Sequence, residues 1–287
     1  MTRSHPPTLL RLVERALQGP CALPQGAQLA VAVSGGPDSM SLLHALSILR
    51  ARLNFELYAL SVDHGLRPEA RAEVDVVAEF AAQLAVPFQS VQLKLAPGGN
   101  LQARARAARY EALWALVDQI SPQGFLATAH HADDRAETVL LRLIRGTSPA
   151  GLAVLSEREG HLLRPLIRAH KTDVLTHNER HHVPVCQDPS NLSRRFMRVR
   201  VRHELMPLLK ELNPKIVEGL CALADESEGQ PLGLSREQRA QLQSALSAPR
   251  SPVDLPLGAG LRLRRELPAK TPRNLPPPSP KLYEPLK

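Results

Sequence analysis

The chain has few cysteines and no long apolar run. Its three cysteines, Cys21, Cys186 and Cys221, are isolated in the sequence, which excludes a C-x-x-C metal clamp and a disulfide framework. No stretch of roughly 18 apolar residues occurs, and the first 19 residues lack an apolar core of signal-peptide length. We therefore expect neither secretion nor membrane insertion, and a reduced, cytoplasmic environment.

Acidic residues are outnumbered. There are 28 Asp and Glu against 36 Lys and Arg, which gives a formal charge of +8 and a pI near 9.9. This balance favours a polyanionic partner such as a nucleic acid, although many basic proteins bind none. The length of 287 residues suits one substantial domain and a smaller one.

Composition divides the chain into four expected parts. We predict an N-terminal helical segment over 1–27, the main domain over 28–190, a basic helical linker over 191–230 and a reduced C-terminal region, partly disordered, over 231–287. Ten of the last 39 residues are proline, which a regular helix or central strand does not accommodate. Within that tail only Val253–Leu267 has the pattern of β structure.

Short apolar runs alternate with amphipathic ones between residues 28 and 145. The expected strands are Gln28–Val33, Phe55–Val62, Phe88–Leu93 and Gly124–Thr128. The expected helices are Ser39–Arg52, Glu69–Leu84 and Leu101–Ile120. This alternation predicts a Rossmann-like α/β fold, in which helices cover both faces of a parallel sheet and ligands bind at the carboxyl ends of the strands.

Polar clusters follow three of the expected strands. They are Ser34-Gly35-Gly36, Asp63-His64-Gly65 and His130-His131-Ala132-Asp133-Asp134. Because the carboxyl ends of parallel strands lie at one edge of a sheet, we expect the three loops to meet in one crevice.

The first of these clusters indicates a phosphate site. Gly35 and Gly36 allow a tight turn whose N–H groups approach an anion, and the helix that starts near Asp38-Ser39 directs its positive end there. The loop has no lysine, so it is not a Walker loop. Asp38 beside bound phosphates requires a cation, and we interpret it as a Mg²⁺ ligand. The alternative is an ordinary strand-to-helix turn.

The run from Leu29 to Met40 resembles the signature of the PP-loop (N-type) ATP pyrophosphatases, which cleave ATP between the α- and β-phosphates and adenylate a substrate. The resemblance implies that ATP binds the segment Ser34, Gly35, Gly36, Pro37, Asp38 and Ser39.

The cluster after the fourth strand brings carboxylates to the same edge. A helix that begins near Asp133 places Asp134 and Glu137, three residues apart, on one face. Helix capping explains one such carboxylate but not both together with two histidines upstream. A metal site that includes His130 and His131 stays open, although adjacent histidines point apart.

Taken together, these motifs resemble the tRNA(Ile)-lysidine synthetase family over about residues 29–210. The further shared segments are Ser61–Arg67, Ala105–Tyr110, Arg145-Gly146-Thr147, and Asp188–Asn191 followed by Phe196. The resemblance makes residues 28–190 a PP-loop adenylation domain. It implies a ligase that forms a carbon–nitrogen bond, with ATP and Mg²⁺ as cofactors and L-lysine and tRNA(Ile) with a CAU anticodon as partners; a homodimer is open.

The family resemblance also assigns residue roles. Asp134 and Glu137 would bind the lysine ammonium and help to deprotonate it, and His130 would act at the reacting cytosine. With Asp38, these are the expected catalytic residues.

The segment from Leu192 to Lys215 is strongly basic. Arg195, Arg198, Arg200 and Arg202 are the residues we expect to bind the tRNA backbone, because a row of cations suits phosphates. The alternative is a solvated charged helix. The segment also departs from the family pattern, since Val199 stands where asparagine is expected between two arginines.

Two other functions remain open. A PP-loop tRNA thiolase shares the loop and the adenylated base but would usually require paired cysteines. A catalytically inactive RNA-binding protein could retain the fold, although the retention of Asp38, His130, Asp134 and Glu137 argues against it.

Overall fold

The computed structural model describes residues 8–63, 69–93, 101–186 and 197–228, together with three short strands at 253–258, 261–265 and 281–283. The side chains of these strands, and of residues 69–70 and 101–103, lie outside the description. The chain forms two compact units, one of Met1–Thr138 with Leu155–Cys221 and one of Val139–Val154 with Ala222–Lys287.

The first unit alternates strands and helices along the chain. Its first half contains α1 (Leu9–Gln18), β1 (Ala27–Ala32), α2 (Pro37–Leu53), β2 (Phe55–Asp63), α3 (Glu69–Gln83), β3 (Phe88–Gln92) and α4 (Leu101–Ile120). Its second half contains β4 (Phe125–Ala127), the start of α5 (Ala132–Ile144), β5 (Arg158–Glu159), β6 (Leu162–Leu163), α6 (Lys171–His181), α7 (Met197–Arg200), the π-helical turn η3 (Val201–Leu205), α8 (Met206–Leu212) and the start of α9 (Ile216–Ser227).

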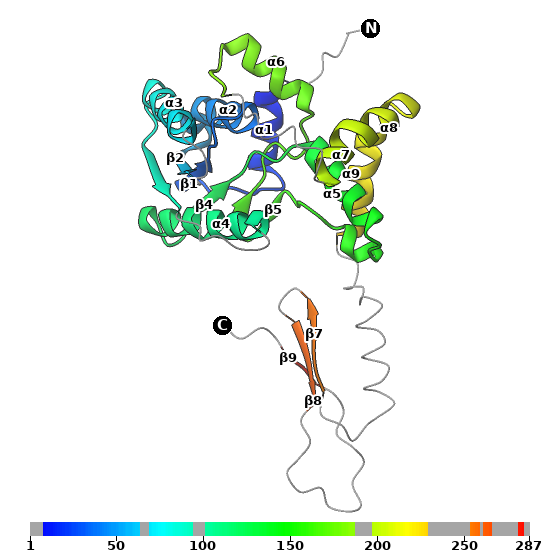
Figure 1. The fold of residues 1–287 in the computed structure, drawn as a ribbon. Coiled ribbons are helices and arrows are strands. Elements are labelled where there is room, and N and C mark those ends of the chain that lie inside the picture. The colour runs from blue at the N-terminus through cyan, green and yellow to red at the C-terminus, as the bar shows by residue number, and fades with distance from the viewer. Residues whose placement is uncertain are drawn as a thin grey trace, which may run out of the picture. The chain divides into compact units, whose positions relative to one another are not determined.

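Six strands form one sheet in the order β3-β2-β1-β4-β6-β5 (Figure 1). All neighbouring pairs are parallel except β5 with β6. The strand order reverses between β1 and β4, and open α/β sheets bind ligands at such a reversal. The predicted α/β fold is confirmed, and the four predicted strands agree with β1 to β4 to within two residues at each end.

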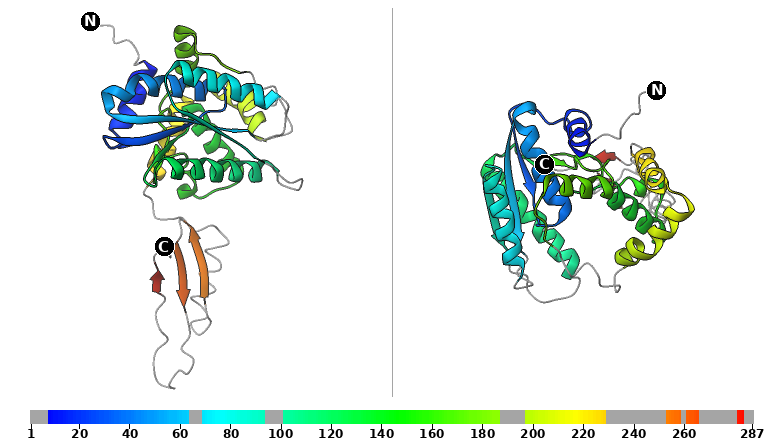
Figure 2. Two further views of the ribbon diagram at one scale, coloured as in Figure 1. Left: turned by 90° about the vertical axis from the view of Figure 1, so that its left-hand side faces the viewer. Right: turned by 90° about the horizontal axis from the view of Figure 1, so that it is seen from above.

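Helices cover both faces of this sheet, as the turned view shows, with α2 and α3 on one side and α4 on the other (Figure 2). Side chains alternate along a strand, so β1 supplies Leu29 and Val31 to one apolar cluster and Ala30 to the other. The first cluster includes buried residues of α1, α2, α3 and α6, and the second is completed by Leu113 and Val117 of α4.

The second unit contains the 3-10 turn η1 (Pro149–Leu152) and an antiparallel sheet of β7 (Val253–Gly258), β8 (Leu261–Arg265) and β9 (Lys281–Tyr283). The hairpin of β7 and β8 lies within the segment that was expected to form β structure. The remainder of the predicted C-terminal region, 231–252, 259–260, 266–280 and 284–287, lies outside the described residues. In the described part of the chain, no helix has both the length and the apolar character needed to cross a bilayer.

Helix α6 is held along α2 by contacts at successive turns. Asn178 donates from Nδ2 to the carbonyl of Pro37 at 3.0 Å and accepts from Ser41 Oγ. One turn further along α2, His44 Nδ1 lies 2.9 Å from His177 Nε2. The rings of His44, His177 and His181 lie 4.5–5.0 Å apart, centroid to centroid. These contacts fix α6 relative to the helix that opens the nucleotide loop.

The histidine contacts predict a pH dependence of stability. Burial, then the nearby His44, His181 and Arg180, lower the pKa of His177 from 6.5 to about 4. Below pH 6.5 the unfolded chain binds a proton that folded His177 does not, so stability falls as pH decreases. His177→Gln should therefore lose less melting temperature between pH 7 and pH 5 than the parent protein.

The control for this measurement is His203→Gln, because His203 is exposed. Thermal unfolding followed by circular dichroism at pH 7, 6 and 5 gives the comparison. An unchanged pH slope in His177→Gln would contradict the assignment.

Candidate active site

The loop after β1 has the conformation that a phosphate site requires. Gly35 has a φ of +79°, in the left-handed region, and a Cβ there would lie 3.2 Å from Sγ of Cys186. The backbone N–H of Cys186 donates to the carbonyl of Gly35 at 2.9 Å. Ser39 closes the turn, since its Oγ accepts from the N–H of Ser34 at 3.1 Å and donates to the carbonyl of Gly36 at 3.1 Å. A side chain at residue 35 would therefore strain the backbone and crowd Cys186.

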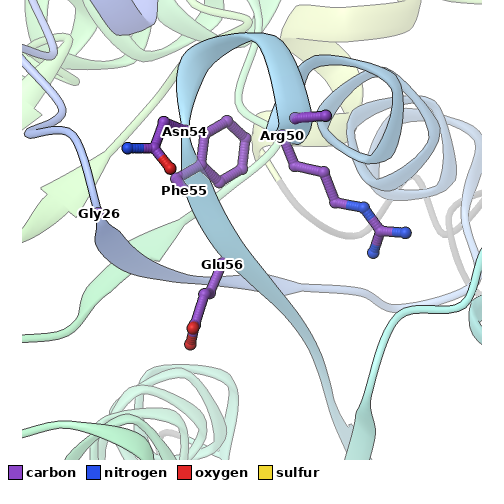
Figure 3. A pocket seen from close by; sticks show the side chains of 6 residues that line it. Gly26, Arg50, Asn54, Phe55 and Glu56 are labelled. Carbon is purple, nitrogen blue, oxygen red and sulfur yellow. The ribbon is translucent and has the colours of Figure 1, made fainter.

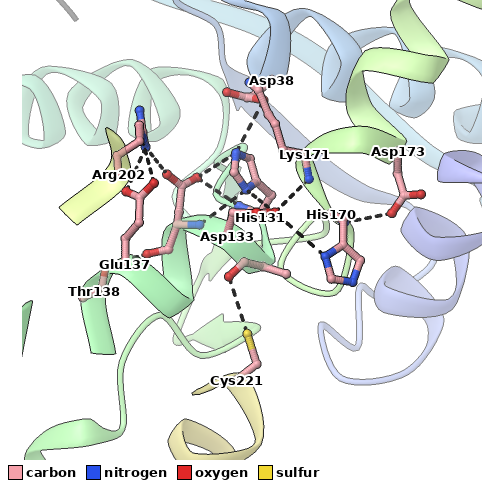
Figure 4. Close-up of polar contacts among 12 residues, drawn as sticks. Asp38, His131, Asp133, Glu137, Thr138, His170, Lys171, Asp173, Arg202 and Cys221 are labelled. Carbon is pink, nitrogen blue, oxygen red and sulfur yellow. Dashed lines mark hydrogen bonds and ion pairs between the residues drawn. The ribbon is translucent and has the colours of Figure 1, made fainter. Parts of the chain in front are cut away.

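Asp38 lies in the first turn of α2, and its carboxylate faces the side chains of Lys171 and His131 (Figure 4). Lys171 Nζ donates to its Oδ1 at 2.6 Å, and His131 Nε2 lies 3.6 Å from the same oxygen. The lysine absent from the loop sequence is thus present beside the loop, contributed by the first residue of α6. The side chain of Asp38 is 31% exposed, so it remains accessible to a ligand.

His131 is buried among three carboxylates, only 3% exposed. Besides Asp38, its Nε2 lies 3.3 Å from Asp134 and its Nδ1 lies 3.8 Å from Asp133. Its neighbour His130 contacts Thr128 instead, Nδ1 to Oγ1 at 3.0 Å. The two histidines therefore diverge, and within the described part of the chain no group of three or more metal-binding side chains forms.

His130 is held neutral by its surroundings. Burial lowers its pKa to about 3; Asp134 opposes this, while Arg164, Arg106 and Arg109 reinforce it. At neutral pH the ring consequently has one donor and one acceptor nitrogen.

Asp134 and Glu137 lie side by side on α5, as the sequence predicts, and both bind arginines. Arg202 donates to Glu137 through Nε at 2.6 Å and Nη2 at 2.9 Å, and through Nη2 to Asp134 at 3.0 Å. Arg198 makes longer contacts to the same two carboxylates, at 3.3 and 3.4 Å. The Glu137 side chain is 4% exposed, whereas those of Arg198 and Arg202 are 44% and 42% exposed.

Two of the acidic groups of α5, Asp133 and Asp134, have lowered pKa values. Burial raises the pKa of Asp134, but His131, His130, Arg198 and Arg202 together bring it below its usual value. The pKa of Asp133 is likewise lowered, against burial, chiefly by its hydrogen bond from Lys210 at 2.7 Å. The site thus holds ionised carboxylates whose present partners are side chains of the same chain.

Three buried arginine and tyrosine atoms lack hydrogen-bond partners within the described part of the chain. They are Arg109 Nε, Tyr110 OH and Arg164 Nε. Buried donors without partners are rare in native structures, and a bound anion would satisfy them. Arg109 and Tyr110 belong to the Ala105–Tyr110 segment of the family resemblance, and Arg164 was not predicted.

A separate hollow lies at the opposite end of the sheet. It is lined by Gly26, Arg50, Ala51, Asn54, Phe55 and Glu56, where β1 and β2 begin (Figure 3). Arg50 donates to the carbonyls of Leu84 and Ala85 and so has a structural role. This hollow is remote from the carboxyl ends of the strands and is not the candidate site.

Several predicted residues lie outside the described part of the chain: His64 and Gly65, Asp188–Asn191, Arg195 and Phe196. Lys171, Lys210 and the arginine pairs of Asp134 and Glu137 were not predicted, because each contact joins residues 38 or more apart in the sequence.

The arginine pair predicts a stability change. Arg202→Met leaves the buried Glu137 with only Arg198, so the free energy of unfolding should fall by about 1–3 kcal/mol at pH 7. Urea unfolding measures it. Arg200→Met is the control, because Arg200 is 65% exposed and its ion pair within the described residues is the one with the exposed Glu204, so its effect should stay within about 0.5 kcal/mol. Equal losses in both variants would contradict the buried ion pair.

Comparison with known proteins supports one family. Residues 9–209 match the model of the PP-loop domain. The tRNA(Ile)-lysidine synthase of Symbiobacterium thermophilum is 39% identical over 215 residues, which cover 71% of this chain and 44% of that protein. That of Coxiella burnetii is 34% identical, over 80% of this chain and 52% of its own. The chain thus spans about half the length of these two relatives.

A solved structure and a shorter relative complete the comparison. The U34-tRNA thiolase NcsA of Methanococcus maripaludis, with its [4Fe-4S] cluster, superposes with a TM-score of 0.66 at 21% identity, covering 79% of this chain and 81% of that one; this likeness shows the fold alone. The tRNA(Ile)-lysidine synthase of Thermobifida fusca is 36% identical over 77% of this chain and 69% of its own. The chain therefore belongs to the tRNA(Ile)-lysidine synthase family of PP-loop proteins.

Proposed function

We propose that the protein is a tRNA(Ile)-lysidine synthase, a ligase that adenylates the wobble cytidine of tRNA(Ile) with a CAU anticodon and then joins lysine to it, releasing pyrophosphate and AMP. One observation carries the proposal: His131 lies within 3.6 Å of Asp38 and 3.3 Å of Asp134. The nucleotide loop and the pair of carboxylates that suit an ammonium are therefore adjacent, as the attack of an amine on an adenylated base requires.

ATP would bind the loop. The N–H groups of Gly35 and Gly36 and the N-terminus of α2, which begins at Pro37, favour its phosphates, and Ser39 holds the turn closed. Cleavage between the α- and β-phosphates makes pyrophosphate the leaving group.

Mg²⁺ fits the residues present. It is usually held by one or two carboxylates together with substrate phosphates, and Asp38 offers an accessible carboxylate already paired with a cation, Lys171. When bound there, Mg²⁺ would neutralise charge on the pyrophosphate.

Lysine would bind Asp134 and Glu137. The carbonyl oxygen of cytosine leaves poorly until it is joined to AMP, after which an amine can attack C2 of the ring. Lysine arrives mostly as the ammonium ion, which two carboxylates recognise by charge. One of them would then take the proton as the amine becomes nucleophilic. The ion pairs that arginines now make with these carboxylates support this role.

His130 would act at the cytosine. Because burial and the surrounding arginines keep the ring neutral, it can donate or accept a hydrogen bond at the base without adding positive charge near the incoming ammonium. The partnerless Nε atoms of Arg109 and Arg164 would meet a phosphate on the same side.

The tRNA backbone would bind the basic segment. Arg200 is its most exposed described arginine, and we propose that it contacts phosphate together with Arg195, Arg198 and Arg202. Arg198 and Arg202, which now bind Asp134 and Glu137, would contact the phosphates once lysine takes their place on these carboxylates. A cytoplasmic location and a homodimer remain predictions.

The thiolase alternative is weaker. The thiols of Cys21 and Cys221 are buried and donate to the carbonyls of Glu157 and Ala132, whereas Cys186 lies against Gly35. The three cysteines thus have separate neighbours in the fold. A catalytically inactive RNA-binding protein would have no need of a compensated set of ionised carboxylates.

The first test is product analysis. Incubation with ATP, radiolabelled lysine and tRNA should give AMP, pyrophosphate and lysine joined to RNA. Asp38→Asn removes the proposed metal ligand and should slow AMP formation roughly ten- to hundredfold, with tRNA binding unchanged. ADP and phosphate as products would refute the proposal, and equal loss of turnover and tRNA binding would indicate misfolding.

The second test separates lysine use from adenylation. Glu137→Gln preserves size but removes charge, so the lysine concentration needed for half-maximal rate should rise roughly tenfold or more while adenylated tRNA accumulates or hydrolyses. Glu204→Gln, at an exposed ion pair, is the control. The parent rate should also rise between about pH 7 and 9 as more amine is free. A Glu137→Gln variant with unchanged lysine use would leave helix capping as the explanation.

A further inference from the structure

The substrate proposed above has a second charged end that Asp134 and Glu137 do not bind. Near neutral pH free lysine carries an α-carboxylate and an α-ammonium besides the ammonium of its side chain. With the side-chain ammonium on Asp134 and Glu137, the α-carboxylate would lie close to the same row of acidic groups and be repelled by them. The α-carboxylate therefore requires a cation within the site.

Several cations of the site already have a place in the proposed reaction. Lys171 binds Asp38 at the nucleotide loop, with Nζ 2.6 Å from Oδ1. Arg198 and Arg202 pair with the two carboxylates that would receive the side-chain ammonium. These cations are engaged at the loop or at the side-chain end of the substrate, so the α-carboxylate needs a further one.

Lys210 supplies a cation on the neighbouring carboxylate. Its Nζ donates to Asp133 Oδ1 at 2.7 Å, and Asp133 precedes Asp134 in the first turn of α5. His131 lies between the two aspartates, because its Nδ1 faces Asp133 at 3.8 Å and its Nε2 faces Asp134 at 3.3 Å. The pair of Lys210 and Asp133 is thus separated by one imidazole ring from the carboxylate that would receive the side-chain ammonium.

The ammonium group of Lys210 can change its partner. The Lys210 side chain is 46% exposed, whereas that of Asp133 is 12% exposed. Asp133 does not depend on Lys210 alone, since its Oδ2 also accepts the backbone N–H of Lys171 at 2.9 Å. A ligand that draws Lys210 away therefore leaves Asp133 with a hydrogen bond.

We propose that Lys210 binds the α-carboxylate of the substrate lysine and so selects an amino acid over a simple amine. The α-ammonium of the same lysine takes the place that Lys210 leaves on Asp133, so both charges of the present ion pair keep a partner. This rests on the proposed function only in requiring that the site bind lysine. The competing explanation is that Lys210 does no more than offset the charge of Asp133.

Binding measurements distinguish these two roles without turnover. The probes are L-lysine and L-lysinamide, which differ only in that the amide has no negative charge at the α position. Each is titrated by calorimetry into the full chain in the presence of Mg²⁺ and the uncleavable α,β-methylene-ATP. The parent protein should bind lysine roughly tenfold or more tightly than lysinamide, because a charge-assisted hydrogen bond to the carboxylate is lost in the amide.

Lys210→Met should weaken lysine binding roughly tenfold or more and remove this preference. Lysinamide should bind the variant as tightly as the parent or more tightly, since its α-ammonium no longer competes with Lys210 for Asp133. Lys210→Arg should retain most of the preference for lysine.

Lys215→Met is the matched control, because Lys215 is an exposed lysine in the turn before α9 and its loss should change both affinities less than about twofold. Equal weakening of lysine and lysinamide in Lys210→Met, or no weakening of lysine, would overturn the inference. A parent protein that binds the two compounds equally, or binds no lysine, would do the same. If the parent protein and the variants show the expected affinities but no lysidine forms on tRNA, the proposed function fails while the role of Lys210 stands.

Discussion

The structure depends on the pairing of acidic side chains with cationic ones at the point in the sheet where the strand order reverses, between β1 and β4. Four carboxylates gather there, those of Asp38, Asp133, Asp134 and Glu137, and without cations they would repel one another and the phosphates of a nucleotide. Each has a partner from the later part of the first unit: Lys171 for Asp38, Lys210 for Asp133, and Arg198 with Arg202 for Asp134 and Glu137. His131 lies between three of them.

This compensation would let one site serve the two chemical steps of the proposed reaction. A buried, ionised carboxylate that is paired with a flexible side chain has already lost most of its water. It can therefore exchange that side chain for a substrate cation without first losing a full shell of water. We infer that lysine replaces the guanidinium contacts on Asp134 and Glu137. The side chains of the four cationic residues are 35% to 46% exposed, which is consistent with such exchange, whereas Glu137 stays buried. These residues are Lys171, Arg198, Arg202 and Lys210.

The sequence predicted the parts that local pattern encodes. Short apolar runs located β1 to β4, the glycine turn located the loop, and the spacing of three residues placed Asp134 beside Glu137. It could not predict the partners of these carboxylates, because Lys171 is 133 residues from Asp38 and Arg202 is 65 residues from Glu137. The sequence indicates His131 only as a possible metal ligand together with His130. In the structure it is buried between Asp38 of the nucleotide loop and Asp134 of α5, and so it connects these two parts of the site. Arg198 and Arg202, which the sequence assigns to tRNA binding, bind the carboxylates of Asp134 and Glu137.

The most direct test of the exchange of cations is a crystal structure of the chain with L-lysine, Mg²⁺ and α,β-methylene-ATP bound together. The account predicts the side-chain ammonium of lysine within hydrogen-bond distance of Asp134 or Glu137, with Arg198 or Arg202 displaced. A structure in which both arginines keep their carboxylates, and lysine binds elsewhere, would contradict it.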